Sequence, residues 1–237
     1  MSIERDLITS LLKLTKKGSI LIENVKNDCR IPLGIMSKLL ANLQSEGLVY
    51  LNSDMIEANS SMRIKLMVKA ASLGADVERI SNFLCWQEFE EIAAFSLRNY
   101  GYVVANNVRF KHGGRKWEID VVACKKPLVV CIDCKHWQHA IAPSALKRIV
   151  DSQIERTKAF ADSLPIIALN FECTRWNDAK FIPAVMSLMP SSFKFYDKVP
   201  VVPILKMQDF LNHLPVYTEH VKIFSKSFNN LSHNFQN

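Results

Sequence analysis

Residues 118–137, with the sequence EIDVVACKKPLVVCIDCKHW, constrain the fold more than any other part of this chain. Two apolar runs flank a short polar turn, and each run has the length and the β-branched content of a buried strand. Both faces of each run are apolar, which predicts central strands in a sheet that is covered on both sides. Asp120, Asp133 and Lys135 interrupt these runs where apolar residues are expected.

These charged residues are predicted to share one face of the sheet. Asp133 and Lys135 are two positions apart, so they point to the same side of a strand. A hairpin with an even number of loop residues pairs positions whose numbers sum to an odd value, and Asp120 and Asp133 meet that condition. Buried acids that lie close together repel each other and need a cation. Lys135 could neutralise one acid in a non-catalytic ion pair, whereas a divalent metal could satisfy both.

Two helices are predicted to flank these strands. Residues 86–102, WQEFEEIAAFSLRNYGY, form an amphipathic pattern with Glu90 at the edge of the buried face, while Glu88 and Glu91 are expected in solvent. Residues 143–160 form a second apolar stripe, and Gln153 lies on or beside it. A buried amide needs a partner, either in an active site or on nearby backbone.

Glu90 on a helix, Asp120 on a strand and Asp133-Cys134-Lys135 on the next strand resemble the E…D…(D/E)xK pattern of the PD-(D/E)XK nuclease superfamily. The similarity is greatest to archaeal restriction-endonuclease-like proteins of the Mrr type that carry a winged helix, and it extends more distantly to Holliday-junction resolvases. It covers roughly residues 86–160. Ile119 stands where the name-giving proline would be, and because that position is not a ligand the departure leaves the chemistry intact.

The resemblance implies an α/β fold, a restriction-endonuclease-like α/β/α sandwich with a mixed sheet. It implies hydrolysis of DNA phosphodiester bonds with Mg²⁺ or Mn²⁺ as cofactor. Lys135 would orient the attacking water or the scissile phosphate, and Gln153 would support the site, as a glutamine on this helix does in related nucleases. The implied metal ligands are Glu90, Asp120, Asp133 and the carbonyl of Cys134.

The N-terminal region, residues 1–60, has the order of a small winged helix-turn-helix domain: helical segments followed by a hairpin. Its third helix would enter a DNA groove, and the alternative is a winged helix used for dimerisation or domain packing. The residues that could face DNA are Arg30, Ser37, Lys38 and Asn42.

The rest of the chain is divided by its helical and strand patterns. Residues 61–84 are predicted to form a helical connector, residues 85–225 the nuclease-like domain and residues 226–237 a flexible tail. Within the nuclease-like domain, LPIIALNF (residues 164–171) is predicted as another buried strand. VPVVPILKMQDFLNHL (residues 199–214) is predicted as a strand followed by a final helix.

The net charge of +7 favours a polyanionic partner, and DNA is the expected one. A nuclease that cuts duplex DNA with one active site per chain is expected to act as a homodimer. This inference rests on the need to cut two strands and not on any residue of the chain. Candidate phosphate contacts in the second domain, each of which could equally be solvated surface, are Lys111, Arg115, Lys116, His136, His139, Lys147 and Arg148.

A zinc site formed by Cys131, Cys134, His136 and His139 is a rival interpretation of the same stretch. Residues three apart in a strand point to opposite faces, so Cys131 and Cys134 could not bind one ion without a break in the strand. The six cysteines lie in apolar segments, which suits reduced thiols. The N-terminus has no signal-peptide pattern and no window approaches a membrane span, so we expect a cytoplasmic protein with no membrane partner.

The predicted function is a metal-dependent endodeoxyribonuclease whose winged helix positions DNA. An enzyme that resolves branched DNA is one alternative. A DNA-binding regulator whose nuclease-like domain has lost catalysis is another, and the set of Glu90, Asp120, Asp133 and Lys135 argues against it, because a binding module has no need of clustered buried acids.

Overall fold

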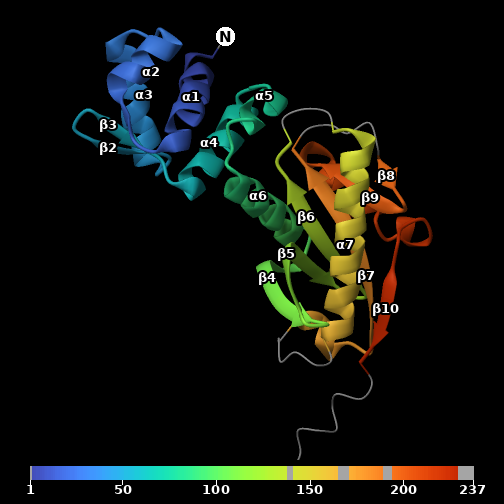
Figure 1. Cartoon of the computed structure of the whole chain (residues 1–237). Coiled ribbons are helices and arrows are strands. Elements are labelled where there is room, and N and C mark those ends of the chain that lie inside the picture. The colour runs from blue at the N-terminus through green and yellow to red at the C-terminus, as the bar shows by residue number, and fades with distance from the viewer. Residues whose placement is uncertain (1, 138–140, 165–170, 189–193, 229–237) are drawn as a thin grey trace, which may run out of the picture. The chain divides into compact units, whose positions relative to one another are not determined.

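The computed structural model describes residues 2–137, 141–164, 171–188 and 194–228. The chain divides into two compact units, Met1–Phe89 and Glu90–Asn237. Figure 1 traces both from the N-terminus. Among the described residues, no helix is both long enough and apolar enough to cross a membrane.

The first unit begins with helices that alternate with very short strands. The strands form a three-stranded antiparallel sheet in the order β1-β3-β2. The elements are α1 (Ile3–Leu14), the 3₁₀ helix η1 (Thr15–Lys17), β1 (Ile20–Leu21), α2 (Ile22–Cys29), α3 (Leu33–Ser45), β2 (Tyr50–Asn52) and β3 (Met55–Glu57).

Helical spacing of apolar residues explains why these elements pack. The Ser2 side chain accepts a hydrogen bond from the Arg5 backbone N–H and caps α1. Apolar side chains then recur at helical spacing and become fully buried on one side of α1. The buried core of this region contains Leu7, Ile8, Leu11, Leu12, Val25, Met36, Leu40, Leu43 and Ile56.

The residues expected to form a connector belong to the first unit. They form α4 (Ser60–Ser72) and α5 (Val77–Ser81). The side chains of Asn59 and Asp76 cap the two helices by accepting backbone N–H groups of Met62 and Arg79. Leu66 and Ala70 of α4 are fully buried. The compact first unit therefore extends to Phe89, beyond the winged-helix order of residues 1–60.

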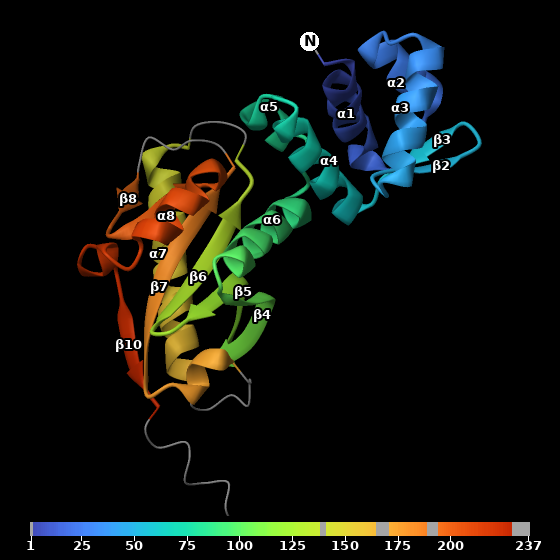
Figure 2. The ribbon, with the colours of Figure 1, turned by 180° about the vertical axis from the view of Figure 1, so that it is seen from behind.

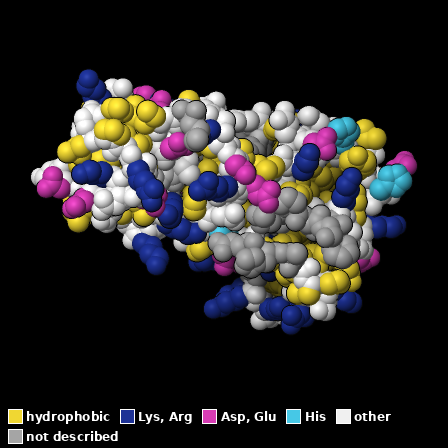
Figure 3. Space-filling model, turned by 90° about the horizontal axis from the view of Figure 1, so that it is seen from above, with side chains coloured by type: hydrophobic (Ala, Val, Ile, Leu, Met, Phe, Trp, Pro, Cys, Tyr) yellow, Lys and Arg dark blue, Asp and Glu magenta, His cyan; other side chains and the backbone are white. Residues whose placement is uncertain are grey.

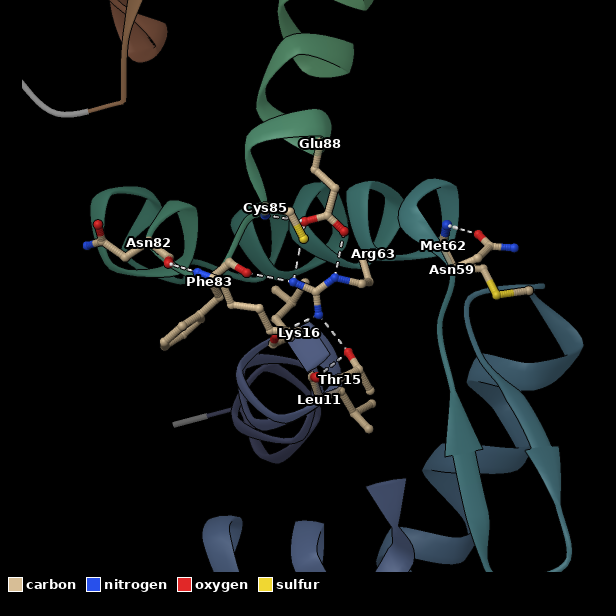
Figure 4. Close-up of polar contacts among 11 residues, drawn as sticks. Leu11, Thr15, Lys16, Asn59, Met62, Arg63, Asn82, Phe83, Cys85 and Glu88 are labelled. Atoms are coloured by element: carbon tan, nitrogen blue, oxygen red, sulfur yellow. Dashed lines mark hydrogen bonds and ion pairs between the residues drawn. The ribbon is translucent and has the colours of Figure 1, made fainter. Parts of the chain in front are cut away.

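A buried ion pair joins α4 to the first turn of α6 (Trp86–Asn99), as Figure 4 shows. Arg63 Nε donates to Glu88 Oε1 at 2.6 Å, and the two side chains are 3% and 1% exposed. Glu88 also accepts the Cys85 backbone N–H at 2.7 Å. The expectation that Glu88 is solvated is therefore wrong. Its partner lies 25 positions upstream, where the helical pattern of α6 gives no information.

The second unit contains a seven-stranded mixed sheet in the order β4-β5-β6-β7-β9-β8, with β10 also paired to β7. β4, β5 and β6 are antiparallel, whereas β6–β7 and β7–β9 are parallel pairs. The strands are β4 (Val103–His112), β5 (Arg115–Lys125), β6 (Leu128–Lys135), β7 (Asp178–Ser187), β8 (Phe195–Tyr196), β9 (Val199–Pro203) and β10 (Phe224–Ser227).

Helices lie on both faces of this sheet. α7 (Pro143–Ser163) lies along one face, and α8 (Met207–His213) lies on the other, together with the part of α6 that belongs to this unit (Figures 1 and 2). Phe160 of α7 is fully buried between Phe110 and Phe181, with ring centroids 5.3 and 6.0 Å away. The unit is therefore a mixed α/β fold whose central strands are covered on both sides, as the apolar runs predicted. Three 3₁₀ helices complete it: η2 (Glu172–Arg175), η3 (Ile204–Lys206) and η4 (Tyr217–Glu219).

One strand of the sheet was not predicted from the sequence. Residues 165–170 of LPIIALNF lie outside the described residues, and the strand that pairs with β6 is β7. Pro183 obscures β7 in the sequence, because proline is unusual within a central strand. On one side of β7, β10 pairs with Asp178–Phe181 and β9 with Val185–Ser187. Pro183 lies between these two partners.

The C-terminal segments agree with the predicted order of strand, then helix, in β9 and α8. The first residues of the predicted flexible tail belong to the folded unit, since Lys226 and Ser227 are in β10 and Phe228 is 5% exposed. Residues 229–237 lie outside the described residues.

Candidate active site

The charged stretch forms the neighbouring strands β5 and β6. Their register runs from Val121 opposite Ile132 to Lys125 opposite Leu128. Continued by one residue, it brings Asp120 opposite Asp133, which is the pairing that strand parity predicted. β6 is unbroken from Leu128 to Lys135, so Cys131 and Cys134 point to opposite faces, as the argument against a zinc site requires.

Asp133 is buried between two cations. It is 2% exposed. Lys135 Nζ donates to its Oδ1 at 3.0 Å and lies 2.8 Å from its Oδ2. The Arg156 guanidinium, from α7, donates to the same Oδ1 at 2.6 Å. These are charge-assisted hydrogen bonds to a buried carboxylate, so they fix the position of the Asp133 side chain.

Gln153 bridges β6 and Arg156. Its side chain is fully buried, and its Nε2 donates to the Cys131 carbonyl at 2.7 Å. Its Oε1 accepts a hydrogen bond from Arg156 at 3.1 Å. Gln153 therefore makes both kinds of contact that were considered for it. Its amide forms a hydrogen bond with nearby backbone, and it also forms one with the side chain of Arg156 in the charged cluster.

Sequence reasoning missed Arg156. A signal existed, since Arg156 is three positions after Gln153 and therefore lies on the same side of α7. Its side chain is 22% exposed, so it borders both the buried acid and solvent.

The pKa values of Asp120 and Glu90 are both raised above their usual values. Burial raises the pKa of Asp120, although the Cys134 backbone N–H donates to its Oδ2 at 2.7 Å and opposes that shift. Glu90, on α6, is 7% exposed. Burial, followed by the negative charges of Asp120 and Glu118, raises its pKa to about 7. The positive charge of Lys135 opposes both shifts without cancelling them.

The donor chemistry of this cluster fits a hard divalent cation. Carboxylate and carbonyl oxygens are the ligands that Mg²⁺ prefers, and an added cation would relieve the repulsion between Glu90 and Asp120. Within the described parts of the chain, however, no three His, Cys, Asp or Glu side chains are grouped closely enough to hold a metal ion. Asp133 directs its oxygens to Lys135 and Arg156. The predicted metal ligands remain Glu90, Asp120, Asp133 and the Cys134 carbonyl.

A cavity of about 300 Å³ opens beside Asp133. Lys135, Arg148 and Arg156 line it, with Ser152 contributing a hydroxyl group. Three cations face one buried acid, so the net charge of the cavity is positive and suits a phosphate group.

The other predicted phosphate contacts of this unit lie on its surface. Lys111 and Lys116 are exposed and directly opposite each other on β4 and β5. Arg115 lies 4.1 Å above the ring of Trp117. Lys147 is exposed and paired with Asp151 at 2.6 Å.

His136 follows β6 and is half-buried, whereas His139 lies outside the described residues. On the face that Figure 3 shows, Lys and Arg side chains are spread among acidic and apolar ones.

In the first unit, the predicted DNA contacts are all exposed. Ser37, Lys38 and Asn42 lie on α3, and the Ser37 hydroxyl donates to the Leu33 carbonyl at 2.9 Å. Arg30 follows α2 in the left-handed conformation, with φ of 54°.

The chain is similar to several known proteins. An uncharacterized protein of Archaeoglobus fulgidus is 28% identical over 133 residues, which are 56% of this chain and 93% of that protein. VC1899 from Vibrio cholerae aligns over 92% of this chain and 52% of its own, with 12% identity and a TM-score of 0.40. Can2 from Sulfobacillus thermosulfidooxidans, solved in complex with cyclic tetra-adenylate, aligns over 91% and 50%, with 11% identity and a TM-score of 0.38. The chain thus spans about half the length of these solved structures.

A family model matches the region that contains the charged cluster. Residues 86–169 match the nuclease-related domain, NERD, which belongs to the PD-(D/E)XK nuclease-like superfamily. All of the predicted catalytic residues lie in this range: Glu90, Asp120, Asp133, Lys135 and Gln153. The part of the chain that assembles the cluster is therefore the part that is similar to a nuclease-related domain.

Proposed function

We propose that this protein is a metal-dependent endodeoxyribonuclease of the Mrr-like type. The observation that carries the proposal is the group of acids at β5, β6 and α6, in which burial and neighbouring acids raise the pKa values of Glu90 and Asp120. Charge arranged in this way destabilises a fold, so it is more typical of a functional site than of a structural one. The similarity of residues 86–169 to a nuclease-related domain supports the same conclusion.

Each residue has a chemical task in this proposal. Mg²⁺ or Mn²⁺, held by Glu90, Asp120, Asp133 and the Cys134 carbonyl, would lower the pKa of a bound water and stabilise charge on phosphate oxygens. Lys135, held by Asp133, orients the attacking water or the scissile phosphate and offsets the developing negative charge. Gln153 fixes the position of Arg156 beside Asp133.

We further propose that the first unit binds DNA as a winged helix-turn-helix domain. The element order α1-β1-α2-α3-β2-β3 supports this, because it places a hairpin after the third helix. The exposed residues of α3 would face the groove, and the cytoplasmic protein would act on duplex DNA as a homodimer.

Cleavage of supercoiled plasmid and of branched DNA tests the catalytic proposal. The purified protein is incubated with Mg²⁺, Mn²⁺ or EDTA, beside the variants Asp120→Asn and Lys135→Ala. We expect cutting that needs the metal and falls at least about a hundredfold in both variants, as expected when a charged group that stabilises the transition state is removed. Preference for branched DNA would favour a resolvase.

The ion pairs of Asp133 favour a second candidate, a DNA-binding regulator without catalysis, because Asp133 already has two cationic partners. A protein that binds both DNAs and cuts neither with any of these metals would support the regulator and exclude the nuclease. Wild-type and variant proteins would then bind with the same salt dependence.

A further inference from the structure

We propose that Arg156 is the counter-ion of Asp133 in the metal-free protein. When a metal binds Asp133, it displaces Arg156, and Arg156 then binds the substrate phosphate. The inference rests on the proposed nuclease function and assigns to that site a means of coupling metal binding to substrate binding. Arg156 acts here through Asp133, so it is a positioning residue.

The contacts of Asp133 require an exchange of partners before it could bind a metal. Its Oδ1 accepts bonds from Arg156 at 2.6 Å and from Lys135 at 3.0 Å. A metal ion at that oxygen would lie close to the guanidinium, and two cations at such a distance repel each other strongly in a buried site. Arg156 and the metal therefore compete for one carboxylate oxygen.

Gln153 defines where Arg156 docks. It is fully buried and fixed to β6 through the Cys131 carbonyl, and it accepts a second bond from the Arg156 group that binds Asp133. A buried amide with both ends bonded has little freedom to move. The fixed position of Gln153 therefore determines where Arg156 lies when it is bonded to Asp133.

The neighbouring cavity offers Arg156 a second position. Arg156 lines it together with Lys135, Arg148 and Ser152, and the Arg156 side chain is partly exposed. A guanidinium binds a phosphate with two parallel hydrogen bonds, so a phosphodiester group in this cavity is a strong competitor for Arg156. A phosphate that attracts Arg156 would leave Asp133 bonded to Lys135 alone and open to the metal.

Metal and phosphodiester should therefore strengthen each other's binding, and by thermodynamic linkage the factor is the same in both directions. Without Arg156, the metal should bind Asp133 more tightly, and the phosphodiester should raise the metal affinity by a smaller factor than in wild type. This is the signature that separates an exchanging counter-ion from a merely structural arginine.

Calorimetric titration of Mg²⁺ into the full-length, metal-free protein tests the exchange at a pH above the pKa of Glu90. Wild type, Arg156→Gln and the matched control Lys158→Gln are compared with and without dimethyl phosphate, a minimal phosphodiester. Lys158→Gln removes an exposed charge from the same helix, and Lys158 does not line the cavity. Circular dichroism and thermal melting show that each variant is folded.

We expect Arg156→Gln to bind Mg²⁺ about tenfold more tightly than wild type in the absence of dimethyl phosphate. Dimethyl phosphate should raise the Mg²⁺ affinity of wild type and of Lys158→Gln by the same factor, and that of Arg156→Gln by a smaller factor. If folded Arg156→Gln binds Mg²⁺ with wild-type affinity while wild type cuts DNA, the exchange is wrong and the nuclease function stands. If wild type neither binds Mg²⁺ nor cuts DNA, both are wrong.

Discussion

Charged side chains are buried in two regions of the molecule, and the two regions differ in how well those charges are stabilised by their neighbours. Near the start of α6, Arg63 donates to the Leu12 carbonyl at 2.7 Å. It also donates to Thr15 at 2.6 Å and to the Phe83 carbonyl at 2.6 Å, in addition to Glu88 (Figure 4). This guanidinium and its carboxylate partner are fully bonded. In the cluster at β5 and β6, the acids Glu90 and Asp120 instead have raised pKa values because burial and the charges of neighbouring acids disfavour their ionised forms.

The difference teaches how to separate structural charge from functional charge. A buried ion pair whose hydrogen bonds are all made holds elements together and needs nothing further. Acids that remain short of cations store unfavourable energy, which a ligand of opposite charge can relieve. Stability measurements should therefore give opposite signs when one charge is removed from each region.

The largest effect is expected from Arg63→Met. Glu88 would remain buried with its charge unpaired, so the free energy of unfolding should fall by about 3–5 kcal/mol, measured by urea denaturation. The double variant Arg63→Met/Glu88→Leu removes both charges and should recover a large part of that loss. A double variant no more stable than the single one would show that packing of Arg63, and not its charge, stabilises this region.

Glu90→Gln should have the opposite effect in metal-free protein. The folded pKa of Glu90, about 7, is above its usual value of 4.5, so the folded state binds the proton more tightly than the unfolded state does. Wild-type stability should consequently fall as the pH rises from 4.5 to about 7. Above that range the variant should be more stable by about 2 kcal/mol, and below pH 4.5 the two proteins should be equal.

The control for this measurement is Glu91→Gln, which removes an exposed acid from the same helix. Its difference from wild type should not depend on pH over this range. A pH-dependent gain in Glu91→Gln equal to that of Glu90→Gln would mean that general charge, and not the β5–β6 cluster, causes the effect.

The smallest effects on stability are expected at the surface cations. Lys147→Gln breaks an exposed pair with Asp151 and should change the free energy of unfolding by less than about 1 kcal/mol. Lys111→Gln removes a like charge opposite Lys116 and should stabilise the sheet by about 0.2–1 kcal/mol. If Lys111 contacts phosphate, Lys111→Gln should also reduce the slope of DNA affinity against salt by about 1, measured by fluorescence anisotropy. An unchanged slope would show that Lys111 faces solvent and does not contact a phosphate group.

Local patterns predicted the centre of the second unit well. The positions of Asp120, Asp133 and Lys135 follow from the alternation of side chains along a strand, and the length of the turn fixes which residues face each other. The helices on either side of the strands have ordinary apolar stripes. These features depend on residues that are close in sequence.

The errors arose where a distant partner decides the outcome. Glu88 has the pattern of a solvated residue, and it is buried because Arg63 meets it. β7 contains a proline that a central strand tolerates because its neighbours β10 and β9 pair with different parts of it. The position of Arg156 beside Asp133 depends on how α7 packs on the sheet, which no local pattern gives.

The order of the strands in the second unit determines when the charged cluster could first exist during synthesis. β6 lies between β5 and β7, and β7 begins at Asp178, more than 40 residues after β6 ends at Lys135. A nascent chain that stops short of β7 has Asp120, Asp133 and Lys135 but leaves one edge of β6 without its partner. If the cluster cuts DNA, that connectivity would keep the growing chain harmless to nucleic acid until most of the domain has been made.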